Sequence, residues 1–366
     1  FTYEKDENGE LKPVPAPAKL TLLRGTGAEW TAEFLEDEES NVFHKAMVLD
    51  LGEPVLLTIG ANGARLKTWK KVDGVWQGTT HWAPTFGGKQ ERLRDFEIGD
   101  VTGDGRDDVV IATHDMGVVA VAEIPADGGD WKITEVDRTD HRTFVHEVEI
   151  GDVDGDGVDE FFVTPSAPNV LDGSAQPGHI VGFRKTDSGF ERFELAGFLG
   201  AHVKEILVAD LEGRGRADVF AAIEPERKKT EAGVTVEDPL IIRRYRFDGP
   251  EVVEEDIATF RDEQCRFLIA GDLTGDGNQE LVASTMTTGV WMLRQSEAGW
   301  MVELIDKDSD NHEYEHATNI IDLDNDGKNE LYVVSDSLPP LPGMVRRYKY
   351  NGEGFDEEEI LPLPKD

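Results

Sequence analysis

The stretch DVDGDGVDE, at Asp152–Glu160, recurs along the chain with its acidic positions held in place. It returns as DVTGDGRDD at Asp100–Asp108, as DLTGDGNQE at Asp272–Glu280 and as DLDNDGKNE at Asp322–Glu330. An altered copy, DLEGRGRAD, lies at Asp210–Asp218. Each copy follows a short apolar run and precedes another, which predicts the loop of a strand-loop-strand hairpin.

The spacing of oxygen-bearing residues in these loops suits a hard cation. Side-chain oxygens at loop positions 1, 3 and 5, a backbone carbonyl at 7 and a carboxylate at 9 are what Ca²⁺ requires, and the glycines permit the tight turn. We therefore predict about four structural Ca²⁺ ions; an acidic, glycine-rich turn without a metal is the alternative. The predicted ligand positions are Asp100, Thr102, Asp104, Arg106, Asp108, Asp152, Asp154, Asp156, Val158, Glu160, Asp272, Thr274, Asp276, Asn278, Glu280, Asp322, Asp324, Asp326, Lys328 and Glu330.

The altered copy carries an arginine where the other copies carry an aspartate. Arg214 stands at loop position 5. Its guanidinium is expected to take the place of the ion and to pair with Asp210, Glu212 and Asp218. This loop is therefore predicted to hold its shape without calcium.

Composition limits the classes of partner. Acidic residues outnumber basic ones by 75 to 37 and give a formal net charge of −38, which four bound Ca²⁺ would bring to about −30. This charge argues against nucleic acid and anionic membranes as partners. No apolar run reaches the roughly 18 residues of a membrane-spanning helix, so no membrane insertion is expected. The single cysteine, Cys265, excludes an intramolecular disulfide.

The expected location is secreted or periplasmic. The chain begins with Phe1 rather than methionine, which suggests a removed signal peptide or a trimmed chain. Short, open Ca²⁺ loops fill where calcium is plentiful, which favours the same setting.

The repeat predicts the architecture. Units counted from the residue six positions before each loop are spaced by 50, 52, 58, 62 and 50 residues. Each unit holds four short strands, the pattern of radially repeated four-stranded sheets. The first unit has no calcium loop but has the four strands. The units begin at His44, Arg94, His146, Lys204, Arg266 and His316.

The N-terminal residues 1–43 are expected to add a partial blade. Leu20–Leu23 and Trp30–Leu35 echo the later outer strands at Trp291–Leu293 and Trp300–Leu304. We therefore predict one all-β domain over residues 1–366, a seven-bladed β-propeller with calcium loops between the first and second strands of its blades. A six-bladed ring is the alternative.

The loops, their flanking strands and the unit length resemble the FG-GAP/VCBS repeats of integrin-alpha-like β-propellers, from about residue 44 onward. The resemblance implies the fold and calcium, whereas the activity stays open because such propellers include adhesion modules, lectins and lyases. A narrower similarity, at Arg142–Ile150 and His316–Glu330, is to the propeller of aldos-2-ulose dehydratases. It implies a sugar-dehydrating reaction.

All six unit starts are basic or imidazole residues, although the chain is strongly acidic. In a propeller the first strands line the central channel, and loops at their ends place their starts at the opposite mouth. The six residues are therefore predicted to ring that mouth. Arginine and lysine there suit a carboxylate or sulfate, and histidines suit proton transfer or a metal. Solvated channel-lining residues without a ligand are the alternative.

Two classes of function follow from this ring. The first is an enzyme, a carbon-oxygen lyase or dehydratase that acts by β-elimination on an anionic or oxidised sugar. The second is a non-catalytic lectin or adhesion propeller that binds a glycan, such as a uronate or sulfated sugar, or a protein. The candidate catalytic residues are His146, His316, Tyr314, Arg94, Arg266 and Lys204. The candidate ligands of a second metal, zinc or manganese, are His44, His146, His202 and His316.

Overall fold

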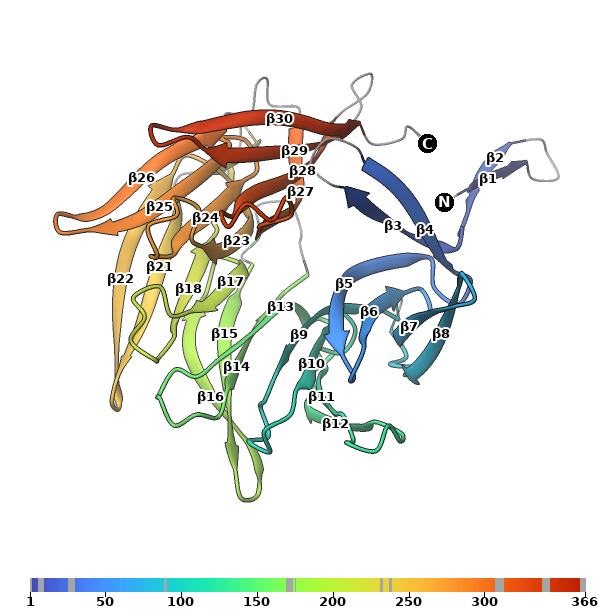
Figure 1. Cartoon of the computed structure of the whole chain (residues 1–366). Helices are drawn as coiled ribbons and strands as arrows, with labels where there is room; N and C mark the ends of the chain where they lie inside the picture. Colours follow the sequence, from blue (N-terminus) through green and yellow to red (C-terminus); the bar gives the residue numbers. More distant parts are fainter. Residues whose placement is uncertain are drawn as a thin grey trace.

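The computed structural model describes the chain except residues 1, 6–9, 26–29, 89–90, 169–173, 175, 231–232, 237–238, 307–312, 338–342 and 363–366. The described residues form six four-stranded antiparallel sheets and three two-stranded sheets. Figure 1 shows the four-stranded sheets as blades around a central space. The predicted all-β propeller is therefore confirmed.

The strands of each blade follow one another outward from the centre, except that a hairpin interrupts blade 4. Blade 1 consists of β5 (Val42–Asp50), β6 (Pro54–Ala61), β7 (Leu66–Val72) and β8 (Val75–Trp82). Blade 2 consists of β9 (Leu93–Gly99), β10 (Asp108–Thr113), β11 (Val119–Glu123) and β12 (Lys132–Asp137). Blade 3 consists of β13 (Phe144–Gly151), β14 (Glu160–Ser166), β15 (Gly178–Thr186) and β16 (Gly189–Phe198). Blade 4 consists of β17 (Val203–Ala209), β18 (Asp218–Ile223), β21 (Leu240–Asp248) and β22 (Glu251–Phe260). Blade 5 consists of β23 (Cys265–Gly271), β24 (Glu280–Thr285), β25 (Val290–Ser296) and β26 (Gly299–Asp306). Blade 6 consists of β27 (Glu313–Ile321), β28 (Glu330–Ser337), β29 (Met344–Tyr350) and β30 (Phe355–Pro362).

The three two-stranded sheets lie outside this series. They are β1 (Thr2–Lys5) with β2 (Leu11–Val14), β3 (Ala18–Gly25) with β4 (Trp30–Asp37), and β19 (Arg227–Thr230) with β20 (Gly233–Val236). Figure 1 shows β3 and β4 between blade 6 and blade 1, and the β1–β2 hairpin projecting from the ring.

The prediction of seven blades is wrong in its count, and the six-bladed alternative holds. The described residues contain six four-stranded blades. The predicted outer strands at Leu20–Leu23 and Trp30–Leu35 exist, within β3 and β4, but no described strand supplies the inner half of their sheet. The repeat of outer-strand motifs led to the higher count, because a pair of outer strands looks the same in sequence whether or not its blade is complete.

The core lies between the blades. The second strands are buried on both faces; every residue of β10, β18 and β24 is buried. Apolar residues of neighbouring blades meet there, as when Leu57 and Ile59 of blade 1 join one cluster with Val109 and Ile111 of blade 2. The fourth strands carry most of the exposed positions. Within the described part of the chain, no helix has the length and hydropathy needed to cross a membrane.

Candidate functional site at the channel mouth

Every residue predicted to ring the channel mouth lies at a β-bulge in the first strand of its blade. In β5 the pairing with β6 shifts between Phe43 and Lys45, so His44 is an extra residue. A bulge bends the strand and redirects the side chain at that point. The six positions are thus equivalent in the fold as well as in the sequence. The same shift occurs in the other five first strands, at Arg94, His146, Lys204, Arg266 and His316.

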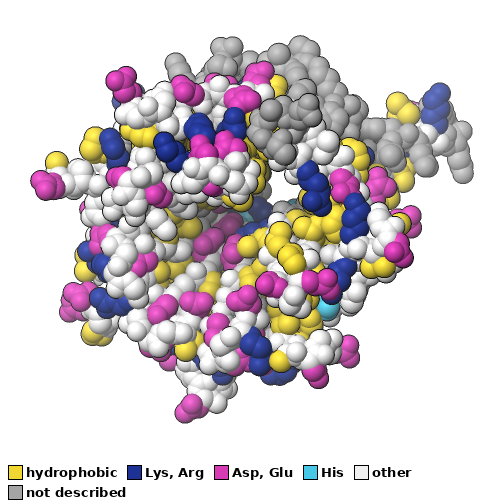
Figure 2. Space-filling view, viewed as in Figure 1, with side chains coloured by type: hydrophobic (Ala, Val, Ile, Leu, Met, Phe, Trp, Pro, Cys, Tyr) yellow, Lys and Arg dark blue, Asp and Glu magenta, His cyan; other side chains and the backbone are white. Residues whose placement is uncertain are grey.

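Two histidines from neighbouring blades meet at this mouth. His114 follows β10 and His146 lies in β13, and His114 Nε2 is 3.1 Å from His146 Nδ1. Arg92 Nη1 lies 3.3 Å from His114 Nδ1. The ring of Phe144 stacks on His114 with the two centroids 4.7 Å apart. Both histidines are buried, and Figure 2 shows basic, acidic and histidine side chains in the central hollow.

The hydrogen bonds fix the tautomers of the two imidazoles. An arginine can only donate, so His114 Nδ1 accepts from Arg92 and the neutral ring of His114 carries its proton on Nε2. That proton is then donated to His146 Nδ1, which leaves the proton of neutral His146 on Nε2. His146 Nε2 is buried without a partner among the described residues. The mouth therefore offers an unused N–H donor to an incoming oxygen acceptor.

Burial and positive neighbours keep these histidines neutral. Burial, followed by the charge of Arg94, lowers the pKa of His44 to about 3. Burial is likewise the main reason that the pKa of His146 lies well below the usual value, and the charge of Arg94 adds to it. Burial and the adjacent His146 lower the pKa of His114. We name His44, Arg92, Arg94, His114 and His146 the channel-mouth cluster.

The other predicted catalytic residues lie around this cluster in different settings. Lys204 forms an ion pair with Glu224, Nζ to Oε1 2.9 Å, and Glu224 also lies 3.9 Å from His202 Nδ1. The charge of Arg266 acts on Glu205 deeper in the channel. The side chains of Tyr314 and His316 lie outside the described residues, although their backbones belong to β27.

The candidate histidine ligands of a second metal are only partly brought together. The rings of His146 and His202 have centroids 6.3 Å apart. Within the described residues, the sets of three or more side chains with ligand atoms within 4.8 Å of one another contain carboxylates only. A metal would also need the lone pair that the tautomer of His146 places on Nδ1, where it already accepts a hydrogen bond. The zinc or manganese site stays a prediction.

Below the mouth, carboxylates from three consecutive first strands line the channel. We name Asp95, Glu97, Glu147, Glu149 and Glu205 the channel carboxylates. Lys45 of β5 is their close cation: its Nζ lies 2.9 Å from Asp95 Oδ1 and also bonds Glu97. Backbone N–H groups of the next blades donate to two of them, from Val148 to Asp95 and from Val208 to Glu149. Burial raises the pKa values of Glu147, Glu149 and Glu205, the last to about 8.

Glu205 is expected to make the protein less stable in alkaline solution. Its folded-state pKa of about 8 lies above the ordinary glutamate value, so the folded protein holds this proton more tightly than the unfolded chain. The resulting stability is fully present below about pH 4.5 and is lost as the pH rises to about 8. Glu205→Gln, which stays neutral, should therefore stabilise the protein by on the order of 5 kcal/mol at pH 9 and by about 1 kcal/mol at pH 5. Urea unfolding at both pH values measures this; equal effects at the two pH values would contradict it.

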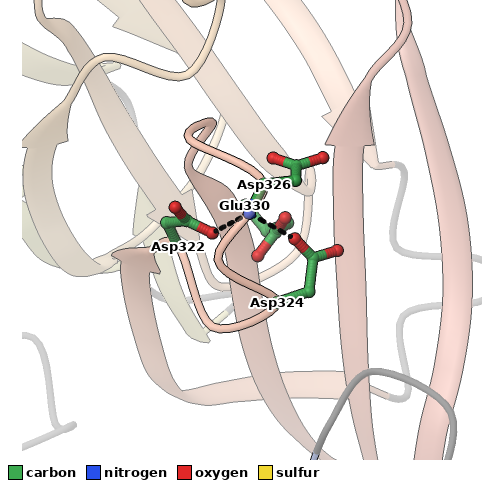
Figure 3. Close-up of side chains that lie close together, drawn as sticks. All are labelled: Asp322, Asp324, Asp326 and Glu330. Carbon is green, nitrogen blue, oxygen red and sulfur yellow. Dashed lines mark hydrogen bonds between the residues drawn. The ribbon is translucent and has the colours of Figure 1, made fainter.

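The acidic loops join the first and second strands of their blades, as the sequence predicts. In each loop the first aspartate accepts backbone N–H bonds across the turn; Asp322 Oδ2 accepts from Gly327 N at 2.9 Å. The fourth loop position has a positive φ, which glycine adopts readily and Asn325 adopts here at 59°. Figure 3 shows Asp322, Asp324, Asp326 and Glu330 converging, with Asp326 N bonded to the first two carboxylates.

Two of the four loops gather carboxylate oxygens closely enough to surround one cation. The ligand atoms of Asp322, Asp324, Asp326 and Glu330 lie within 4.8 Å of one another, and so do those of Asp152, Asp154 and Asp156. These residues occupy the predicted calcium positions, and oxygen donors at this spacing fit Ca²⁺. Loops 100–108 and 272–280 repeat the turn bonds of the first aspartate, to Gly105 N and Gly277 N.

Basic side chains from third strands approach the same carboxylates. Lys349 Nζ lies 3.0 Å from Asp324 Oδ2 and 3.3 Å from Glu330 Oε1. Arg184 Nε lies 3.0 Å from Glu160 Oε1. These cations balance part of the charge that the loops concentrate, so a bound divalent ion would compete with them.

The altered loop is filled by arginine, as predicted. Arg214 Nε lies 3.0 Å from Glu212 Oε2, and its Nη2 lies 2.7 Å from Asp218 Oδ1. Asp210 instead accepts the backbone N–H of Arg214 at 2.9 Å. Arg244, from β21, adds a second guanidinium that bonds both Glu212 and Asp218. Paired arginines therefore neutralise this loop internally.

Sequence reasoning missed the central role of His114 and all of the channel carboxylates. His114 lies after a second strand, where no repeat marks it. A signal for the carboxylates did exist, because Asp95, Glu147 and Glu205 directly follow three of the ring residues. Strict alternation would send these acids to the opposite face from the ring residues, and only the bulges show that both sets can face the channel.

Comparisons with known proteins support the fold. Residues 100–163 match the FG-GAP-like repeat family. This segment contains both loop 100–108 and loop 152–160. The chain is a β-propeller that carries FG-GAP-like repeat sequence, which confirms the resemblance found in the loops. The narrower similarity to aldos-2-ulose dehydratases stays a prediction. A search of curated protein sequences gave no match.

Solved structures with a similar fold include three propeller-sized matches. A lectin from Agrocybe aegerita, described as recognising non-reducing terminal N-acetylglucosamine, is 16% identical with a TM-score of 0.53, over 87% of this chain and 80% of the lectin. The Dos1 propeller is 10% identical with a TM-score of 0.56, over 99% of this chain and 73% of that propeller. A protein from Lactobacillus plantarum is 13% identical with a TM-score of 0.57, over 94% of this chain and 92% of that protein. At these identities the likeness concerns the fold alone.

Proposed function

We propose that this protein is a carbohydrate-binding β-propeller that holds an anionic, polyhydroxylated glycan, such as a uronate or sulfated sugar, at its channel mouth. The observation that carries the proposal is the unused N–H donor of His146 beside two arginines in a protein of net charge −38. Concentrated positive charge and buried donors in an acidic protein favour an anionic oxygen ligand. A lectin of similar fold is described as recognising N-acetylglucosamine, a neutral sugar, so it supports a sugar as the ligand while the anionic charge rests on the arginines alone.

The chemistry of the cluster favours binding over proton transfer. His114 and His146 have lowered pKa values, because burial and nearby positive charge disfavour the imidazolium form. A histidine that resists protonation is a poor general acid and a weak general base. A neutral N–H donor next to guanidinium groups is, in contrast, well suited to a sugar hydroxyl or carboxylate.

We also propose Ca²⁺ in the four acidic loops, with loops 322–330 and 152–160 as the best-formed sites. Asp322, Asp324, Asp326 and Glu330 would hold the ion in blade 6, and Asp152, Asp154 and Asp156 in blade 3. Bound calcium would fix the turns at the ends of the first strands. A secreted or periplasmic location suits both proposals.

β-Elimination at the same mouth is the second candidate function. An acidic sugar that binds beside Arg94 would change the electrostatics of His146, because an anion replaces part of the positive field that lowers its pKa. His146 could then accept a proton from the carbon next to the carboxylate after its own proton moves from Nε2 to Nδ1, while the oxygen on the neighbouring carbon leaves as the C=C bond forms. Appearance of an unsaturated product by ultraviolet absorbance would distinguish this lyase from a binding protein.

The proposed function is tested by binding to anionic oligosaccharides in calcium buffer. His146→Ala removes the unused donor and is expected to weaken binding by tenfold or more, which corresponds to about 1.4 kcal/mol. Arg92→Met should weaken it similarly, because the tautomer of the histidine pair depends on that guanidinium. The matched control is His141→Ala, at an exposed loop position. Glycan binding that survives both cluster substitutions unchanged would refute the proposed site.

A further inference from the structure

The β3–β4 sheet occupies the outer half of a seventh blade position. Trp30, at the start of β4, packs edge-on against Tyr332 in the second strand of blade 6, with ring centroids 6.5 Å apart. Trp300, at the start of the fourth strand of blade 5, packs in the same way against Phe220 in the second strand of blade 4, at 6.3 Å. β4 also leads directly into β5, as every fourth strand leads into the next first strand. β3 and β4 therefore correspond to third and fourth strands.

Complete blades meet through a repeated contact between their first strands. A Cβ added at Gly99 would lie 2.7 Å from Ile150 Cγ2 of the next blade. A Cβ added at Gly151 would lie 2.6 Å from Val208 Cγ1 in the same way. The residue just before each loop thus packs against the residue two positions before the loop of the next blade.

Among the described residues, this contact is missing on both sides of the seventh position. Val48 of blade 1 is 66% exposed, whereas Val208, at the same repeat position in blade 4, is 9% exposed. Ile321 of blade 6 is 40% exposed, whereas its equivalent in blade 1, Leu49, is 1% exposed. The apolar surfaces of two first strands therefore face a place in the ring that no described strand fills.

The loops show the same defect. Leu323, the second residue of the blade 6 loop, is 39% exposed, whereas its equivalent Leu273 in blade 5 is 2% exposed. Next to β3, a cleft of about 520 Å³ is lined by Val48 together with Leu22 and Leu23 of β3. Exposed apolar side chains that gather on the two flanks of one gap favour an interaction site there.

We propose that this gap, which we name the inner seat of the seventh blade, binds a β-hairpin of a partner protein that has the strand, acidic loop, strand pattern of the other inner pairs. The second strand of that hairpin would pair with the free edge of β3 among the described strands, adding main-chain hydrogen bonds to an exposed sheet edge. Its first strand would lie between β27 and β5 and would cover Ile321 and Val48.

The packing rules define which hairpin fits. The residue before its loop must be small, because it lies against Val48 as Gly151 lies against Val208. The residue before that must leave room for Ile321. Residues 266–286 of this chain, the inner pair of blade 5, satisfy both conditions with Gly271 and Ala270. A peptide of that sequence is therefore a suitable probe.

The test is binding of the fluorescent 266–286 peptide to the intact protein by anisotropy, with amide hydrogen exchange of β3 as a second readout. We expect saturable one-to-one binding and slower exchange in Ala18–Gly25. Val48→Asp should weaken binding at least tenfold, and a peptide with Gly271→Leu should fail to bind. Val253→Asp, at an exposed outer-strand position of blade 4, is the control and should bind as the unchanged protein does.

Three results would overturn the proposal. The first is no peptide binding at millimolar concentration. The second is equal binding by the Val48→Asp and Val253→Asp proteins, which would place the peptide elsewhere. The third is a dimer that Val48→Asp dissociates and that excludes the peptide, because a second copy of the chain would then occupy the seat.

Discussion

Chelation of calcium is expected to lower the melting temperature of this protein by on the order of 10 °C. At a free calcium concentration well above the dissociation constant, each bound ion adds about 3–4 kcal/mol to the free energy of unfolding. Without the ion, the carboxylates of Asp322, Asp324 and Asp326 repel one another in a turn that holds their oxygens together. Differential scanning calorimetry with and without a chelator measures the shift.

A single-loop variant separates calcium from the loop's own hydrogen bonds. Asp322→Ala should remove one ion from the stoichiometry measured by elemental analysis and should lower the melting temperature in calcium. It also removes the bond from Gly327 N, so a smaller loss should persist in chelator. Asp187→Ala, at an exposed turn, is the control for loss of a surface carboxylate. Calcium binding at this loop would be contradicted by an unchanged calcium content in Asp322→Ala. It would also be contradicted if the chelator left the melting temperature of the unchanged protein the same.

The repeat allowed the fold and the loop positions to be predicted, because both depend on local spacing. The first strands, their loops and the basic residue six positions earlier recur in register, and a propeller turns that register into rotational symmetry. Arg214 could be placed for the same reason: the other copies of the loop show which position it replaces. The blade count could not be predicted in this way, because it depends on which strands pair with β3, a non-local property.

The chemistry of the channel mouth was harder to predict because it depends on contacts between blades. His146 carries a repeat signal, but its tautomer depends on His114 and Arg92 of the preceding blade. Its low pKa likewise results from burial and from the charge of Arg94, neither of which is visible in the sequence. The sequence therefore led to His146 and to a proton-transfer role, whereas the geometry favours a hydrogen-bond donor.

Replacing Lys45 by methionine is expected to destabilise the protein by about 3–5 kcal/mol, because it would leave buried carboxylates without their close cation. Burial alone would lower the pKa of Lys45, but Asp95 and then Glu97 hold it well above the usual value, so the ammonium is strongly stabilised. The loss should shrink in acid as the channel carboxylates take up protons. Urea unfolding of Lys45→Met measures the cost, with Lys70→Met as the control, since its ion pair with Glu53 is exposed and should contribute less than about 1 kcal/mol. A similar loss of unfolding free energy in both variants would mean that water solvates the channel carboxylates well enough to replace Lys45.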